Sequence, residues 1–132
     1  MRTRLLVVIV VIVSGCAHMY SKDDLDVSLF QHHNNLRWGR LDNAATTVSP
    51  ELRTSFLSTW AARQQTLELQ DVEVQGATLT PDGAAADVVV AITYVDKASM
   101  TVKNVTMIEH WIRTDDGWLE QKFADAPVPP PP

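Results

Sequence analysis

Apolar residues between positions 25 and 41 recur at intervals of three or four residues, the spacing of an amphipathic helix. Asp23 or Asp24 can cap the start of this helix, and Gly39 can end it as a left-handed residue just after the last turn. The pattern therefore predicts a first helix that begins at one of these aspartates and ends at the glycine. Its apolar positions form two sets: Leu25, Leu29 and Leu36, and Val27, Phe30, Trp38 and Leu41.

Two further helices are expected before the first strand. Residues 41–48 are predicted to form a short second helix after the glycine break. The start of a third helix is then indicated by Ser49, Pro50 and Glu51. Serine is favoured at the N-cap, and proline suits the first helical position, where the backbone N–H makes no bond within the helix. Glutamate interacts favourably with the positive end of the helix dipole. The third helix runs to about Gln65. Its predicted buried stripe consists of Leu52, Phe56, Leu57, Trp60 and Ala61.

From residue 67 the apolar period changes from about 3.6 to 2, the period of a β-strand. The apolar positions fall into three pairs: Leu67 and Leu69, Val72 and Val74, and Ala77 and Leu79. Between successive pairs the alternation shifts by one residue, and each shift indicates a β-bulge. Because a bulge bends a strand and increases its twist, we expect a strongly curved first strand with two bulges.

Three more strands complete an antiparallel meander. Residues 84–95 are apolar on both faces, as expected of a central strand, residues 100–113 return beside it, and residues 118–123 form the fourth strand. The turns between the strands fall at residues 81–83, 96–99 and 115–117. The predicted fold class is α+β, with N-terminal helices packed on a curved, four-stranded antiparallel meander.

This order of elements resembles the nuclear-transport-factor-2-like (NTF2-like) fold, a cystatin-like cone shared with ketosteroid-isomerase-like and SnoaL-like proteins. Two local features support the resemblance: the break and alanine-rich second helix of residues 36–45, and the hairpin at Asp116-Gly117-Trp118. The resemblance covers about residues 23–123. Small outer-membrane-assembly lipoproteins resemble a two-helix, three-strand arrangement of similar size, and the predicted fourth strand argues against it.

The N-terminal residues resemble the export signal of a bacterial lipoprotein precursor. Arg2 and Arg4 form a positive segment, and the apolar run of residues 5–13 is shorter than the roughly 20 residues that span a bilayer. Residues 13–16, Val-Ser-Gly-Cys, resemble a lipobox, in which small residues precede a cysteine. A thiol is the side chain nucleophilic enough at neutral pH to accept a thioether-linked diacylglycerol.

The lipoprotein resemblance implies a membrane anchor. Cys16 is expected to become the first residue after cleavage, with a second acylation at its freed amine, and several acyl chains together give stable attachment. The residue directly after the cysteine is Ala17, whereas an aspartate at this position would resemble an inner-membrane retention signal. We therefore expect a lipid-anchored protein of the bacterial envelope, on the outer membrane and facing the periplasm.

The predicted organisation has four parts: a lipoprotein signal peptide at residues 1–15, a lipidated N-terminus and short tether at 16–22, the NTF2-like domain at 23–124, and a Pro-rich disordered tail at 125–132. Cleavage leaves 117 of the 132 residues, which suits one domain. Nine basic and 16 acidic residues then remain, a net charge of −7 with no basic run, which disfavours nucleic acid as a partner.

Few residues offer catalytic chemistry. Asp87 and Tyr94 lie an odd number of positions apart on a regular strand and are expected on opposite faces, as are the neighbours Glu109 and His110. His32 and His33 lie in the first helix, and we expect one of them to be exposed to solvent. Neither has a further ligand four residues away or a cysteine nearby, so the two histidines lack the spacing of a zinc site. We therefore predict no catalytic residue, no metal and no cofactor, and a protein that is not an enzyme.

The four tryptophans, Trp38, Trp60, Trp111 and Trp118, are expected mainly to fill the core between helices and sheet. One or two of them can instead line the mouth of the cone. The candidate pocket or partner surface therefore comprises Arg37, Trp38, Arg40, Tyr94 and Trp111. Arg37 and Arg40 flank Trp38, where they can pair with a partner carboxylate or complement the negative end of the helix.

Three classes of function remain open. The favoured one is a non-enzymatic interaction or assembly module of the envelope that acts on a protein partner. A binder of a small apolar ligand in the cone is the second class. A SnoaL-like or ketosteroid-isomerase-like enzyme is the third.

Replacement of the lipobox cysteine tests the predicted anchor. We expect Cys16→Ser to leave the precursor uncleaved and without lipid, because serine lacks a thiolate at neutral pH. Incorporation of radiolabelled palmitate and fractionation of membranes measure this outcome. Label in the serine variant equal to that in the unaltered chain contradicts the prediction.

Overall fold

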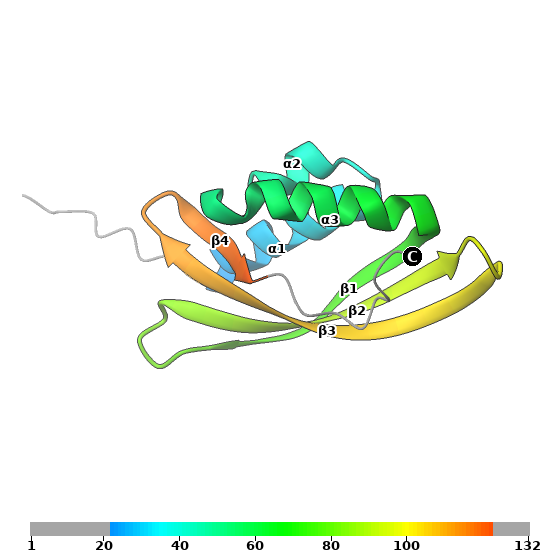
Figure 1. Ribbon diagram of the computed structural model, residues 1–132. Coiled ribbons are helices and arrows are strands. Elements are labelled where there is room, and N and C mark those ends of the chain that lie inside the picture. The colour runs from blue at the N-terminus through cyan, green and yellow to red at the C-terminus, as the bar shows by residue number, and fades with distance from the viewer. Residues whose placement is uncertain (1–21, 123–132) are drawn as a thin grey trace, which may run out of the picture.

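The computed structural model describes residues 22–122 and has an α+β architecture, as the sequence pattern predicts. Three helices lie over one face of a curved, four-stranded antiparallel sheet (Figure 1). The elements are α1 (Lys22–Arg37), α2 (Leu41–Ala45), a 3₁₀ turn η1 (Pro50–Leu52), α3 (Arg53–Thr66), β1 (Leu67–Leu79), β2 (Ala85–Asp96), β3 (Thr101–Thr114) and β4 (Gly117–Lys122). The strands pair in the order β1-β2-β3-β4, so β1 and β4 are the edges.

Several expectations lie outside the described residues. These are the signal peptide at residues 1–15, Cys16 and the tether at 16–22, and the tail at 125–132. None of the helices in residues 22–122 is long and apolar enough to cross a membrane.

The first helix ends as its glycine predicts. Gly39 has a φ of 69°, in the left-handed region. Its N–H donates to the carbonyl of Leu36 at 3.1 Å, and the N–H of Arg40 donates to the carbonyl of Asn35 at 2.8 Å. These two bonds form a Schellman motif, which satisfies carbonyls that the helix end would otherwise leave without partners.

The second helix is shorter than the predicted span of residues 41–48. It ends at Ala45, and Val48 instead forms a parallel bridge with Glu120 of β4. The N–H of Ser49 donates to the Glu120 carbonyl at 2.9 Å, and the N–H of Glu120 donates to the Thr47 carbonyl at 2.8 Å. The backbone of residues 47–49 is therefore held by β4, which prevents it from continuing the helix.

The start of the third helix differs from the prediction in its cap. Pro50 occupies the first position of the 3₁₀ turn η1 rather than of α3, and α3 continues directly from this turn. The Ser49 side chain makes no capping hydrogen bond, and its buried Oγ has no partner within residues 22–122. The cap is weaker than the sequence signal suggests because the serine backbone is bound to β4.

The first strand carries both predicted bulges. Its register against β2 shifts once between Leu69 and Asp71 and again between Val74 and Gly76. The whole sheet curves beneath the helices in Figure 1, consistent with the added bend and twist. Residues of β2 that face the helices are buried: Val88, Val90, Ile92 and Tyr94.

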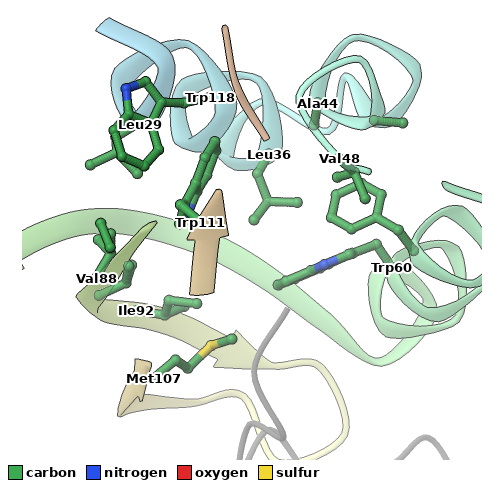
Figure 2. Close-up of a cluster of buried hydrophobic side chains, with 14 of the residues drawn as sticks. Leu29, Leu36, Ala44, Val48, Trp60, Val88, Ile92, Met107, Trp111 and Trp118 are labelled. Atoms are coloured by element: carbon green, nitrogen blue, oxygen red, sulfur yellow. The ribbon is translucent and has the colours of Figure 1, made fainter. Parts of the chain in front are cut away.

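Large side chains fill the space between helices and sheet. Trp60, Trp111 and Trp118 are each at most 3% exposed, as expected for core residues, and Phe56 is fully buried. Figure 2 shows the three tryptophans together with residues from α1, β2 and β3. Trp38 differs from the other tryptophans because 64% of it is exposed to solvent. The interior of the cone is thus occupied by the chain's own side chains.

Substitution of Gly39 tests the helix end. We expect Gly39→Val to lower the free energy of unfolding by at least about 1 kcal/mol, because valine strains a left-handed backbone. The new Cβ would also lie 3.1 Å from Nε2 of Gln64. Thermal and urea melts of the chain from residue 17 onward measure the change. Gly76→Val is the matched control, because no atom lies within 4 Å of its Cβ position, and equal losses in the two variants contradict the explanation.

Candidate functional site

Four ionisable side chains from three elements meet inside the fold. His32 and His33 come from α1, Glu109 from β3 and Glu120 from β4, and each is at most 4% exposed. We call these four residues the buried His–Glu cluster. Trp111 of β3 lies against it, with its ring centroid 5.3 Å from that of His32.

Hydrogen bonds fix the orientation of His32. Its Nδ1 lies 2.8 Å from Oγ1 of Thr47 and 3.2 Å from the carbonyl oxygen of Ala44. The Thr47 hydroxyl donates its own hydrogen to that carbonyl, so both oxygens accept from the ring and Nδ1 carries a proton. Nε2, on the other side of the ring, lies 3.1 Å from Oε2 of Glu120.

His33 and Glu109 form a second close pair. Nε2 of His33 lies 2.9 and 3.0 Å from the two carboxylate oxygens of Glu109. The indole N–H of Trp111 donates to one of these oxygens at 3.0 Å. Nδ1 of His33 is buried and has no hydrogen-bond partner in the described part of the chain.

The two carboxyl groups differ in their preferred charge. Burial opposes ionisation of Glu109, but attraction to His33 and His32 holds the pKa of its carboxyl below its ordinary value. Burial raises the pKa of the Glu120 carboxyl, and repulsion from the Glu109 carboxylate raises it further. Burial is the largest single effect on His32 and lowers its pKa, but Glu120, Glu109 and the Ala44 carbonyl together outweigh it and leave the pKa raised. The fold therefore shifts the two carboxyl groups in opposite directions, Glu109 toward its charged form and Glu120 toward its neutral form.

The predicted opposition of residues on strands is confirmed. Tyr94 is buried, whereas Asp87 on the same strand is exposed on the outer face of the sheet. Glu109 is buried and His110 is exposed, and His110 pairs with Asp87 through its Nδ1. Exposed groups thus meet on one face of β2 and β3, and buried ones on the other.

The expectation that His32 or His33 meets solvent is wrong. Both belong to the buried stripe of α1, because they continue the helical spacing of its leucines: Leu25, Leu29 and Leu36. The helical spacing in the sequence could have predicted the burial of both histidines. In the same way, Glu120 lies two residues after the inward-facing Trp118 on β4, which indicates that it faces the core as well. The sequence carried no signal for the pairing of His33 with Glu109, which lies 76 residues away.

Two surface hollows lie along the seam between α1 and β1. The first has a volume of about 430 Å³ and includes Arg37 and Trp38 from the candidate surface, with Trp60 and Leu69 deeper in the wall. The second has a volume of about 440 Å³. Its lining comprises Leu29, Phe30, His33, Val72 and Val74, with polar residues Asp26, Asn34, Arg37 and Glu73.

The other residues of the candidate surface lie elsewhere. Arg40 is exposed beside the end of α1. Tyr94 and Trp111 are buried in the core and line neither of the two hollows. Of the five proposed residues, Arg37 and Trp38 therefore lie together at the surface, with the guanidinium carbon of Arg37 5.2 Å from the ring centre of Trp38.

Comparison with solved structures establishes the fold. A ketosteroid isomerase-like protein from Erwinia carotovora atroseptica SCRI1043 aligns with a TM-score of 0.57 and 15% identity, covering 81% of this chain and 96% of its own. An NTF2-like protein of unknown function from Shewanella oneidensis MR-1 gives a TM-score of 0.56 and 14% identity, over 76% and 93% of the two chains. The intermembrane space region of the chloroplast protein ARC6 gives 0.52 and 12%, over 80% and 98%.

No protein-family model and no curated protein matches the sequence. The structural matches show that the described domain has the NTF2-like fold, as its order of elements predicts. At these levels of identity they extend to the fold alone, which hosts many unrelated functions.

The two buried glutamates provide a matched test of the charge assignment. At pH 7 we expect Glu109→Gln to lower the free energy of unfolding by about 3–5 kcal/mol, because it removes the charge that pairs with buried histidine. Glu120→Gln should cost less, on the order of 1 kcal/mol, since glutamine resembles the neutral form toward which burial and the Glu109 carboxylate shift Glu120. Urea denaturation with EDTA present gives both values. A larger loss for Glu120→Gln contradicts the assignment.

Proposed function

We propose that this chain is a lipid-anchored envelope protein whose NTF2-like domain binds a protein partner along the seam between α1 and β1, without catalysing a reaction. The observation that carries the proposal is the pair of adjacent hollows, which share Arg37 and have exposed aromatic side chains at their rims. Phe30 is 70% exposed and Trp38 is 64% exposed. Tryptophan and arginine are typical of the residues that contribute most to protein interfaces.

The shape of the seam favours a protein over a small molecule. Arg37 separates the hollows, and its Nη1 lies 3.6 Å from Oδ1 of Asp71. A small molecule fits within one hollow, whereas an occupant of both must cross this ion pair and extend along α1. A helix of 16 residues is about 24 Å long, so the occupant has the length of a polypeptide segment.

The arginine end of the seam supports a partner with both apolar and acidic side chains, whereas the second hollow carries the acidic residues Asp26 and Glu73. Val27 adds a third exposed apolar residue to α1. At the other end of the helix, Arg37 and Arg40 are exposed on both sides of Trp38. Apolar side chains of the partner would enter the hollows, and a carboxylate would meet the arginines.

The arrangement of ionisable groups argues against catalysis. Those that converge on the inner face are buried and bound to one another, as in the His33–Glu109 pair. The exposed pair Asp87–His110 lies on the opposite face of the sheet from the hollows. Acid–base catalysis needs a proton-transferring group within hydrogen-bond reach of a substrate, and the ion pair that lies between the hollows joins Arg37 to Asp71, with no histidine in it.

The proposed anchor places the domain near the outer membrane. Six residues separate Cys16 from the start of α1 if Lys22 is included, and six extended residues span at most about 21 Å. The partner surface would then lie close to the periplasmic side of the bilayer. This favours a partner that is itself part of the envelope.

A second candidate function is the binding of a small apolar ligand in the hollow that includes Phe30 and His33. The observation that favours it is the volume of about 440 Å³, which lies within the usual range of small-molecule sites. Extraction of the purified full chain followed by mass spectrometry detects such a ligand. A stoichiometric apolar molecule that is lost in Val72→Asp would favour this function over a protein partner.

Photo-crosslinking tests the partner surface. A photoreactive amino acid at Phe30 or Trp38 of the full chain is expected to give the same defined protein adduct in the intact envelope. The control position, Thr106, is exposed on the outer face of the sheet and should give none. With the identified partner purified, Phe30→Ala and Trp38→Ala should each raise its Kd at least about tenfold, and Thr106→Ala should not. Equal adducts at all three positions, or equal Kd values, contradict the proposal.

A further inference from the structure

The buried His–Glu cluster offers the donor atoms of a metal site. One ligand atom from each of His32, His33 and Glu109 lies within 4.8 Å of the other two. Oε2 of Glu120 lies 3.1 Å from Nε2 of His32. The fold therefore brings two imidazoles and two carboxylates from α1, β3 and β4 to one place in the core.

The contacts around the cluster resemble the outer shell of a metal site. The proton on Nδ1 of His32 is held by the Ala44 carbonyl and by Thr47, which directs Nε2 toward the carboxylates. Metal-binding histidines usually donate their other ring N–H in this way. The indole of Trp111 likewise donates to one oxygen of Glu109 and fixes the plane of its carboxylate.

The contact between His32 and Glu120 is a close ion pair whose geometry falls short of a well-aligned hydrogen bond. Oε2 of Glu120 lacks a hydrogen-bond partner within residues 22–122, although Nε2 of His32 is only 3.1 Å away. Two ligands of one tetrahedral zinc ion are about 3.3 Å apart, given zinc–nitrogen and zinc–oxygen bonds of about 2.0–2.1 Å. The separation suits two atoms that bind a common ion.

Charge and donor type select the metal. Metal binding requires deprotonated ligands, and in that form two carboxylates and two neutral imidazoles carry a charge of −2, which one divalent cation cancels. Four nitrogen and oxygen donors suit tetrahedral zinc, whereas calcium and magnesium require six or more oxygen ligands. The absence of solvent exposure corresponds to a closed, structural site rather than an open, catalytic one.

We propose that His32, His33, Glu109 and Glu120 bind one structural zinc ion that joins α1 to β3 and β4. Binding requires the ligand atoms of His32, His33 and Glu109, which lie up to 4.8 Å apart, to approach by about 1.5 Å, which side-chain rotation can supply. Glu120, 3.1 Å from Nε2 of His32, would turn toward the same point as the fourth ligand. The ion would act as a cross-link in a domain whose described residues contain no cysteine. This inference is independent of the partner surface, since the α1–β1 seam does not need the ion.

Metal content and cobalt substitution test the proposal on the full chain. Protein purified without chelator should contain about one zinc per chain, and exchange into Co²⁺ should give the intense visible absorption of tetrahedral coordination. His33→Gln should lower zinc affinity more than about 100-fold. The matched control is His110→Gln, which alters an exposed histidine that also pairs with a carboxylate and should leave zinc binding unchanged.

A thermal measurement keeps the test valid if His33→Gln does not fold. EDTA should lower the Tm of the unaltered chain and of His110→Gln, and added zinc should restore both, because an ion that binds only the folded state stabilises it. Zinc below about 0.1 per chain with no effect of EDTA overturns the proposal, as does binding that His110→Gln abolishes and His33→Gln retains. In either case the cluster is a hydrogen-bonded network alone.

Discussion

The contact between α1 and the far strands of the sheet depends on the buried His–Glu cluster. His33 reaches Glu109 on β3, and His32 reaches Glu120 on β4, so one turn of helix is tied to two strands. Glu120 also binds the backbone of residues 47–49 through its own main chain. Separating buried ionisable partners is costly, so the two contacts hold α1 in its place over β3 and β4.

The packing around the cluster explains why the interior is not a ligand cavity. Trp111 and Trp118 from the sheet and Trp60 from α3 point into the space between helices and sheet (Figure 2), and Phe56 of α3 is fully buried beside them. The concave surface that many proteins use for small molecules is here occupied by aromatic side chains. The remaining hollows therefore lie at the rim, where α1 meets the bulged edge strand.

The side chains, rather than the order of helices and strands, decide where ionisable and exposed apolar groups lie in this fold. The same arrangement of helices and sheet occurs in a ketosteroid isomerase-like protein and in part of a chloroplast protein, at 15% and 12% identity. Phe30 on α1 and Trp38 just after it are exposed apolar residues, whereas the histidine–carboxylate pairs are closed within the core or lie on the outer face of the sheet. Such a distribution suits recognition by contact.

Local sequence determined the features that depend on neighbouring residues. Gly39 ended the first helix, and two shifts of apolar alternation located both bulges of β1, because each pattern needs only a few adjacent positions. Tertiary structure alone decided that α2 ends before its bridge to β4, and that His33 meets Glu109 from 76 residues away. The reason is physical: a partner from a distant strand can outweigh helix propensity or bury a charged pair, and nothing near either residue in the chain specifies that partner.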